Sequence, residues 1–225
     1  GQDSLSIARD LGAEVTGVDI SDYAIGFGKK LSADSGIAAN FERADIFDWC
    51  ECAGAPLFDL VYTSYGTICW LSDLERWGRC VAGRLKPGGR FVIIEFHPLL
   101  FALDENDPER LHYDYLGGGL IDDPEGVNDY VGLSGGGLSL DNSTPATLPA
   151  FENPHGAKEY AWGLGETVSA LTAAGLQIES LVEYPYSNGW KPFATMRDLP
   201  GNRKAMPEGS PILPLMFSIT ASKAG

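Results

Sequence analysis

Apolar and polar residues follow two different periods along residues 2–96. Helical spacing covers 2–10 and returns from the N-cap residue Ser21 to about Gly36. Segments rich in β-branched and aromatic residues predict strands over 14–19, 40–43, 57–64 and 90–96. This alternation, with nearly continuous apolar strands, is typical of an α/β protein with a doubly wound, parallel sheet that is covered on both faces.

A further helix is predicted before the last of these strands. Ser72 and Glu75 form an S-x-x-E capping box, and the apolar residues after them keep helical spacing as far as Lys86-Pro87-Gly88-Gly89. Near the C-terminus the same reasoning predicts a helix over 160–174, strands over 176–184 and 215–222, and a long loop over 188–211.

Residues 98–158 differ from the rest of the chain in being rich in Gly, Pro, Asp and Asn. An irregular segment of this length inside a compact fold usually forms a lid or a binding element. We therefore expect one domain over residues 1–225, with 98–158 as a lid or substrate-binding insert within it.

The composition limits the partners of the protein. Of its 225 residues, 44% are hydrophobic, which is enough for a full core. The formal net charge is −15, and the densest basic stretches are only pairs. Nucleic acids and anionic membranes are therefore disfavoured as partners, whereas a neutral or cationic small molecule is favoured.

The four cysteines, at positions 50, 52, 69 and 80, do not have the spacing of a zinc site. We expect ordinary reduced thiols, no metal and a cytoplasmic location. No apolar run approaches the roughly 18 residues of a membrane span. Composition leaves the oligomeric state open.

Polar residues stand at the ends of the predicted strands, which is where a doubly wound sheet binds its ligands. Asp19 ends one strand and has the chemistry to accept two hydrogen bonds from a ribose diol. Asp45 suits an adenine amino group, Ile20 and Ile46 suit the faces of a base, and Gly1 suits close approach of a cofactor to a helix N-terminus. The alternatives are local: the two acids as cap or turn residues, and the two isoleucines as core.

Four stretches resemble, in order and spacing, a class I S-adenosylmethionine-dependent methyltransferase: GQDSLSIARDLGAEVTGVDIS, ERADIF, FDLVYTSYGTICWL and LKPGGRFVIIEFHP. The tail, from YAWGLGETVSALTAAGLQIESLVEYPY to PLMFSITASK, is similar to a bacterial small-molecule branch of that superfamily. The resemblance implies a Rossmann-like sheet of order 3-2-1-4-5-7-6, with an antiparallel pair at one edge. It also implies S-adenosylmethionine as cofactor, with Asp19 at its ribose, Asp45 at its adenine, and Ser64 and Tyr65 closing over it.

The chain departs from the family pattern at its start. In the family, a strand and a glycine-rich loop come before the residue that corresponds to Gly1, and that strand forms the centre of the sheet. We therefore expect that about 40 residues precede Gly1, a length estimated from domain size. If the 225 residues alone formed a monodisperse protein that melts cooperatively, this expectation would be wrong.

Candidate residues on the acceptor side are histidines and aromatics. His97 follows a predicted strand at the substrate edge, and His155 comes before an aromatic segment, so each is a candidate catalytic base or substrate ligand. Either could instead be a turn or cap residue. Tyr160 and Trp162, together with Tyr65, suit the walls of a site for an apolar or cationic substrate, although such aromatics are more often core.

The leading interpretation is S-adenosylmethionine-dependent methyl transfer to a small molecule. One alternative is an NAD-dependent oxidoreductase, because Asp19 also suits an NAD ribose. The Lys86-Pro87-Gly88-Gly89 turn and the terminal pair of strands argue against it. A second alternative is a catalytically inactive methyltransferase fold that serves as a binding protein.

Overall fold

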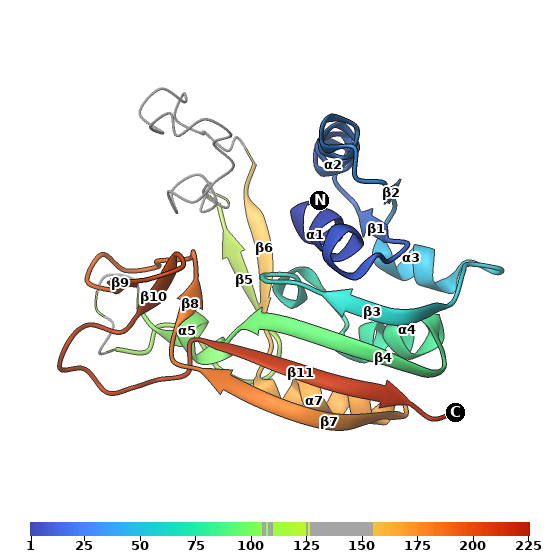
Figure 1. Ribbon diagram of the computed structural model, residues 1–225. Coiled ribbons are helices and arrows are strands. Elements are labelled where there is room, and N and C mark those ends of the chain that lie inside the picture. The colour runs from blue at the N-terminus through green and yellow to red at the C-terminus, as the bar shows by residue number, and fades with distance from the viewer. Residues whose placement is uncertain (105–106, 108–109, 125, 127–154) are drawn as a thin grey trace. The chain divides into compact units, whose positions relative to one another are not determined.

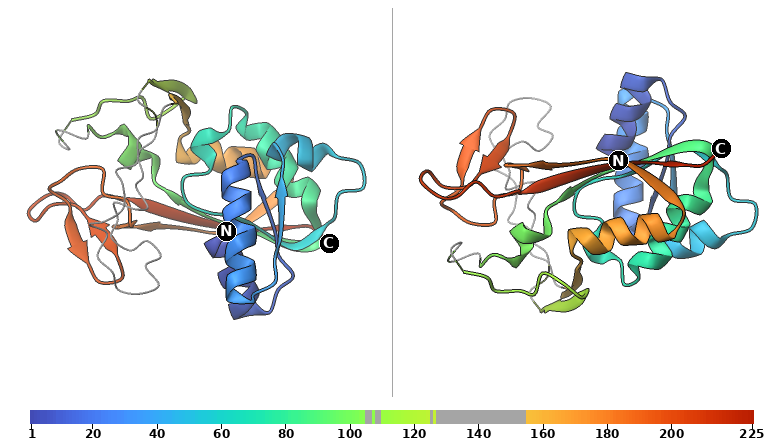
Figure 2. Two further views of the ribbon diagram at one scale, coloured as in Figure 1. Left: turned by 90° about the horizontal axis from the view of Figure 1, so that it is seen from above. Right: turned by 90° about the horizontal axis from the view of Figure 1, so that it is seen from below.

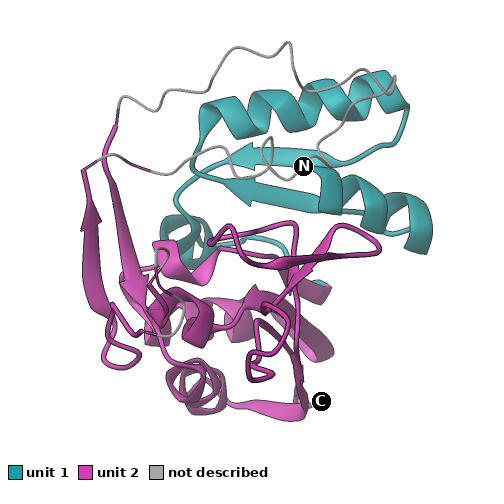
Figure 3. Cartoon of the chain, turned by 90° about the vertical axis from the view of Figure 1, so that its left-hand side faces the viewer, with its two compact units in different colours: residues 1–58 teal, residues 59–225 magenta. Residues whose placement is uncertain are grey.

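The computed structural model describes residues 1–104, 107, 110–124, 126 and 155–225. These residues form two compact units, 1–58 and 59–225 (Figure 3). The expectation of a single domain over residues 1–225 stays a prediction.

Unit 1 alternates helices and strands, as the sequence predicts (Figure 1). Its elements are α1 (Gln2–Leu11), β1 (Thr16–Asp19), α2 (Asp22–Ser35), β2 (Asn40–Arg43) and α3 (Ile46–Glu51). β1 and β2 are parallel, with Asp19 opposite Arg43 at their carboxyl ends. The predicted limits of α2 are confirmed: the Ser21 hydroxyl accepts from Ala24 N at 3.1 Å, and Gly36 ends the helix in the left-handed conformation.

The core of unit 1 is built around one aromatic ring. Phe41, from β2, is buried together with Leu5 of α1 and Ile25 of α2. A Cβ atom at Gly28 would lie 2.9 Å from that ring, and one at Gly17 would lie 3.1 Å from it. Both glycines therefore leave room for the ring between the helices and the strands.

Unit 2 contains a four-stranded sheet in the order β3-β4-β11-β7. Its strands are β3 (Phe58–Thr63), β4 (Leu85–Phe96), β11 (Met216–Lys223) and β7 (Leu176–Tyr184). Figure 1 shows β3 and β4 running in the same direction, whereas β11 is antiparallel to both of its neighbours. The antiparallel pair at the end of the chain is thus confirmed. Among the described residues, no strand comes before α1.

Two helices, α4 (Leu74–Arg84) and α7 (Leu164–Ala173), lie side by side on one face of this sheet (Figure 2). They approach closely because Gly78 has no side chain: a Cβ there would lie 2.5 Å from the carbonyl oxygen of Ala170. The predicted capping box is wrong, because Asp73 rather than Ser72 caps α4, accepting from Arg76 N at 2.8 Å.

The insert holds a short helix, α5 (Pro98–Ala102), and a strand, β5 (Gly119–Asp123). β5 is antiparallel to β6 (Ala157–Ala161), which begins at the end of the insert. The predicted start of a helix at Tyr160 is wrong, because Tyr160 belongs to β6 and pairs with Leu120. The helix α7 begins only after Gly163, whose N–H donates to the Glu166 carboxylate at 2.7 Å.

The predicted loop over 188–211 is also wrong. It holds a small antiparallel sheet of order β8-β10-β9, made of Ser187–Asn188, Arg203–Ala205 and Arg197–Leu199. Buried apolar residues of this region, including Phe193 and Met196, pack with Phe96 and Leu100. The segment is thus anchored by an apolar cluster next to the end of β4.

Among the described helices, none combines the length and the hydropathy that a membrane span requires. Within the same part of the chain, no group of three or more His, Cys, Asp or Glu side chains is placed to hold a metal ion.

Candidate functional site

The two predicted nucleoside-binding acids stand at the same end of the β1–β2 pair in unit 1. Asp19 ends β1, and its Oδ1 accepts from Ser21 N at 2.8 Å. Asp45 follows β2 and caps α3, its Oδ1 accepting from Phe47 N at 2.8 Å and Asp48 N at 3.2 Å. In the described residues, neither Oδ2 takes part in a hydrogen bond. Both local cap roles are therefore present, and each carboxylate keeps one oxygen for a ligand.

The neighbouring candidates differ in their exposure. Ile20 is 64% exposed, and its carbonyl accepts from Arg43 Nε at 3.1 Å. Ile46 is half-buried in the first turn of α3. Gly1 precedes α1, and a Cβ atom there would lie 2.8 Å from the Cα of Gly28. Close approach of α1 and α2 is thus one physical reason for glycine at position 1.

In unit 2, a fully buried carboxylate organises the loop after β3. Glu95, near the end of β4, accepts through Oε2 from Thr67 N at 2.8 Å and Ile68 N at 3.3 Å. Its Oε1 accepts from Phe96 N at 2.7 Å and also from Gly66 N. Four backbone N–H groups therefore converge on one side chain, which fixes the loop against the sheet.

Burial raises the pKa of Glu95 from 4.5 to about 7, although the four N–H donors act in the opposite direction. Sequence reasoning did not select this residue and favoured His97, two positions later. The sequence feature that could have identified Glu95 is its place as the one acid inside the apolar run RFVIIEF. A buried acid is uncommon unless it has hydrogen-bond partners.

Ser64 and Tyr65 begin the loop that Glu95 holds. The carbonyl of Ser64 accepts from the Thr67 hydroxyl at 2.8 Å. The Tyr65 ring is half-buried and packs against the Phe96 ring, with 6.1 Å between the ring centroids. Their role in closing over a cofactor stays a prediction.

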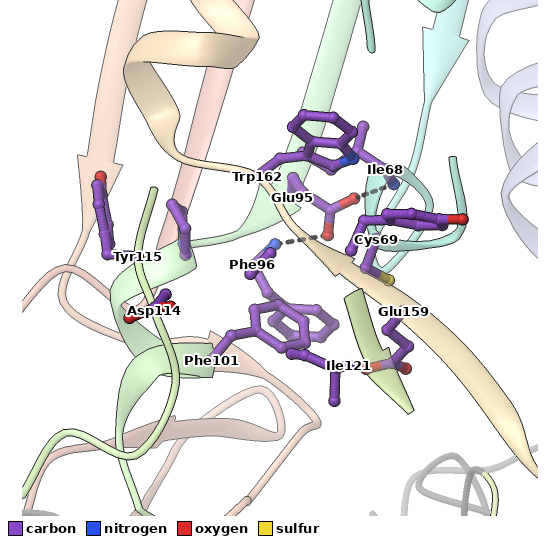
Figure 4. A pocket seen from close by; sticks show the side chains of 13 residues that line it. Ile68, Cys69, Glu95, Phe96, Phe101, Asp114, Tyr115, Ile121, Glu159 and Trp162 are labelled. Atoms are coloured by element: carbon purple, nitrogen blue, oxygen red, sulfur yellow. Dashed lines mark hydrogen bonds between the residues drawn. The ribbon is translucent and has the colours of Figure 1, made fainter. Parts of the chain in front are cut away.

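A pocket lies next to Glu95, entirely within unit 2 (Figure 4). Its walls come from the loop after β3, the end of β4, α5, residues 114–115 and the β5–β6 hairpin with Trp162. Figure 4 shows Glu95, Cys69 and Trp162 on one side, and Phe101, Ile121 and Glu159 on another. Segments that are far apart in sequence thus enclose one largely apolar space.

The predicted aromatic wall is present in this pocket. Tyr160 and Trp162 both line it, and their rings are stacked with centroids 6.1 Å apart. The indole Nε1 of Trp162 donates to the carbonyl of Leu71 at 2.8 Å. Gly118, at φ +60°, lies against the indole, because a Cβ there would be 2.2 Å from the ring. The hydrogen bond and this contact hold Trp162 in place before any ligand arrives.

His97 is buried beside the pocket but is not among its lining residues. Its Nδ1 accepts from Leu99 N at 3.1 Å and so caps α5, and its Nε2 lies 2.9 Å from Glu183 Oε1. The accepting Nδ1 requires the neutral tautomer, with the proton on Nε2. Burial lowers the pKa of His97, and the Glu183 charge opposes this shift.

His155 is exposed, two residues before β6. It does not line the pocket next to Glu95. Catalytic roles for His97 and His155 stay predictions.

Cys69 lines the pocket but is a poor nucleophile. Its Sγ lies 3.5 Å from the carbonyl oxygen of Gly66. Burial and the nearby carboxylates of Glu95 and Glu159 raise the pKa of this thiol well above its usual range. The thiolate is therefore scarce at neutral pH.

Comparison with known families now adds to this geometry. Residues 1–89 match the model of a family described as a methyltransferase domain. An S-adenosylmethionine-dependent methyltransferase of Methanosarcina mazei superposes with a TM-score of 0.56 at 16% identity, covering 98% of this chain and 86% of that one. The chain has the class I methyltransferase fold.

Other proteins with the methyltransferase fold differ in what they do. The glycopeptide N-methyltransferase MtfA, solved with S-adenosylmethionine, gives a TM-score of 0.53 at 16% identity and covers 96% of this chain and 74% of its own. The [4+2]-cyclase SpnF gives 0.56 at 13% identity, with 100% and 71% covered. A comparison with curated proteins finds no match. At these identities the likeness establishes the fold, and the reaction must be argued from the site.

Proposed function

We propose that this protein binds S-adenosylmethionine and transfers its methyl group to a small-molecule acceptor. The observation that carries the proposal is the pair Asp19 and Asp45 at the carboxyl end of β1 and β2, within the residues that match the methyltransferase domain. The structural neighbours whose names include S-adenosylmethionine support the choice of cofactor.

The residues in unit 1 fit the nucleoside part of this cofactor. The unused Oδ2 of Asp19 suits the ribose hydroxyls, and that of Asp45 suits the adenine amino group. The exposed side chain of Ile20 suits one face of the base. When bound, S-adenosylmethionine supplies an electrophilic methyl group carried on a positively charged sulfur. The proposed cofactor-side set is Gly1, Asp19, Ile20, Asp45, Ile46, Ser64 and Tyr65.

Unit 2 supplies the acceptor side of the proposal. Its pocket is walled in part by Tyr160 and Trp162, the aromatic residues proposed to contact the acceptor. Residues 98–158 contribute part of these walls, which supports their proposed role as a substrate-binding insert. His97 and His155 are the proposed proton-accepting residues for an acceptor that needs a base. The proposed location is the cytoplasm.

The experiment is calorimetric titration of the chain with S-adenosylmethionine and, separately, with NAD⁺. We expect binding of the first ligand, weakened about 10- to 100-fold in Asp19→Ala, because hydrogen bonds to a charged group contribute about 1.5–3 kcal/mol. Asp34→Ala removes an acid at the other end of α2 and is expected to leave the affinity unchanged. NAD⁺ binding without S-adenosylmethionine binding would favour the oxidoreductase alternative. Equal affinity in wild type and Asp19→Ala would remove Asp19 from the site.

A further inference from the structure

The segment 186–206, which lies between β7 and β11, is opposite in charge to the chain as a whole. It holds the small sheet of β8, β9 and β10, and it contains four basic residues and one acid, a formal charge of +3 in a chain of −15: Lys191, Arg197, Arg203 and Lys204, with Asp198. Figure 1 shows this sheet beyond the end of β4, next to α5, where apolar residues anchor it. That end of a doubly wound sheet is where ligands bind.

Arg203, on β10, is held in place without using its hydrogen-bond donors. Its guanidinium lies over the Tyr186 ring, 4.4 Å from the ring centroid. Within the part of the chain that the structure describes, this ring contact is the one interaction of the Arg203 side chain. A guanidinium stacked on an aromatic ring keeps its N–H groups at the edge of its plane, where they suit the oxygens of a carboxylate or a phosphate.

Arg197, on β9, stands on the same face of the small sheet as Arg203. Arg203 is opposite Leu199 in the register, and Arg197 comes two residues before Leu199. Long side chains reach one another across such a diagonal. The Nε of Arg197 donates to the carbonyl oxygen of Met206 at 2.9 Å, which fixes the guanidinium. Among the described residues, its two terminal nitrogens have no acceptor.

The acid of this segment is already shared by the two lysines. Lys204, which is 8% exposed, donates to Asp198 Oδ1 at 2.7 Å, and Lys191 Nζ lies 3.5 Å from Asp198 Oδ2. The hydrogen bond from Lys204 and the charge of Lys191 lower the pKa of Asp198. One carboxylate thus faces two ammonium groups, and no acid of residues 186–206 is left to balance Arg197 and Arg203.

We propose that Arg203 and Arg197 form a binding site for the carboxylate or phosphate group of a small molecule. The two guanidinium groups supply positive charge and paired N–H donors, and their contacts with Tyr186 and Met206 set their positions before a ligand binds. The net charge of −15 by itself favours a neutral or cationic ligand, so the preference for an anion arises locally. This inference goes beyond the proposed function, because none of these residues belongs to the proposed cofactor or acceptor set.

The test is calorimetric or NMR titration of the chain with four probes: phenylacetate, phenyl phosphate, inorganic phosphate and 2-phenylethanol. We expect at least one of the three anions to bind, and the uncharged alcohol to bind more weakly. Tighter binding of phenylacetate or phenyl phosphate than of inorganic phosphate would identify an organic acid as the ligand class. Equal binding of phenyl phosphate and inorganic phosphate would identify free phosphate.

Arg203→Ala is expected to weaken anion binding about 10-fold or more, because hydrogen bonds between charged groups are lost. Arg203→Lys keeps the charge but loses the paired donors, so its affinity should lie between those of the wild type and Arg203→Ala. Arg90→Ala is the matched control, since Arg90 is an exposed arginine of the same unit, earlier in β4, beside Glu179. It should leave the anion affinity unchanged.

Near-ultraviolet circular dichroism checks that each variant keeps its tertiary packing. Failure of all three anions to bind would overturn the proposal, as would an anion affinity that is the same in the wild type and Arg203→Ala. An equal loss in Arg203→Ala and Arg90→Ala would also overturn it, because binding would then depend on overall charge. The titration contains no S-adenosylmethionine, so its outcome is independent of the test of the proposed function.

Discussion

Glu95 makes the stability of this protein depend on pH in a defined direction. Its pKa is raised from 4.5 to about 7, so the folded state holds the proton of this group more tightly than the unfolded chain does. The stabilisation from the protonated form is fully present below pH 4.5 and is lost as the pH rises through about 7. Because one pKa unit corresponds to about 1.4 kcal/mol, the full loss is about 3 kcal/mol.

The Glu95→Gln variant removes this titration. Gln has one accepting oxygen, so two of the four N–H donors lose their acceptor, which lowers stability by an amount that does not depend on pH. The difference in unfolding free energy between wild type and Glu95→Gln is therefore expected to change by about 2–3 kcal/mol between pH 5 and pH 8, in favour of the variant at high pH.

Urea denaturation, followed by circular dichroism at both pH values, measures this difference. Subtracting the variant from the wild type cancels the titrations that the two proteins share. Glu179→Gln, a change on β7 of the same sheet, controls for the loss of one carboxylate at a more exposed position. A Glu95→Gln difference that stays constant within about 0.5 kcal/mol from pH 5 to pH 8 would refute the reasoning.

Three further changes test the packing and the helix caps. Gly78→Ala is expected to lower the unfolding free energy by about 1–3 kcal/mol, because its Cβ would lie 2.5 Å from a backbone carbonyl oxygen of α7. Gly83→Ala, on the same helix, places its Cβ in open space and should raise the unfolding free energy by about 0.5–1 kcal/mol. Equal effects of the two substitutions in thermal melts would contradict this packing. In urea melts, Asp73→Ala should lower the unfolding free energy by about 1 kcal/mol and Ser72→Ala by much less, because Asp73 is the N-cap of α4. A larger effect of Ser72→Ala would instead support the capping box of Ser72 and Glu75. His97→Ala should lower the unfolding free energy more than His97→Asn, because Asn can still cap α5. Burial lowers the pKa of His97, so only the wild type should lose stability through this residue as the pH falls below 6.5. Parallel pH profiles of stability for all three proteins would contradict this pH dependence.

Local signals in the sequence were enough for much of the fold. The strands at Asn40–Arg43 and Leu176–Tyr184 have the limits that their patterns predict, and Ser21 caps α2 as expected. Ser72 and Asp73 are both good N-caps and stand side by side, so the S-x-x-E pattern was not enough to identify the residue that caps α4. The strand that contains Tyr160 was missed because it forms only by pairing with residues about 40 positions earlier.

The site was less accessible to prediction for the same reason. The acids Asp19 and Asp45 could be found because each follows its own strand directly. The role of Glu95 depends on the docking of a loop that lies 27 to 29 residues earlier in the chain, which no local pattern reveals. Glu159 and Asp114 were not selected as site residues, because only the fold brings them to one pocket.

Release of S-adenosylhomocysteine tests the central claim most directly. The chain is incubated with S-adenosylmethionine and, in turn, with amines, phenols, thiols and carboxylic acids, and the product is measured by mass spectrometry. The account predicts release that depends on the acceptor and falls in Asp19→Ala. No acceptor-dependent release from a chain that binds S-adenosylmethionine would contradict methyl transfer and leave a cofactor-binding protein with the methyltransferase fold.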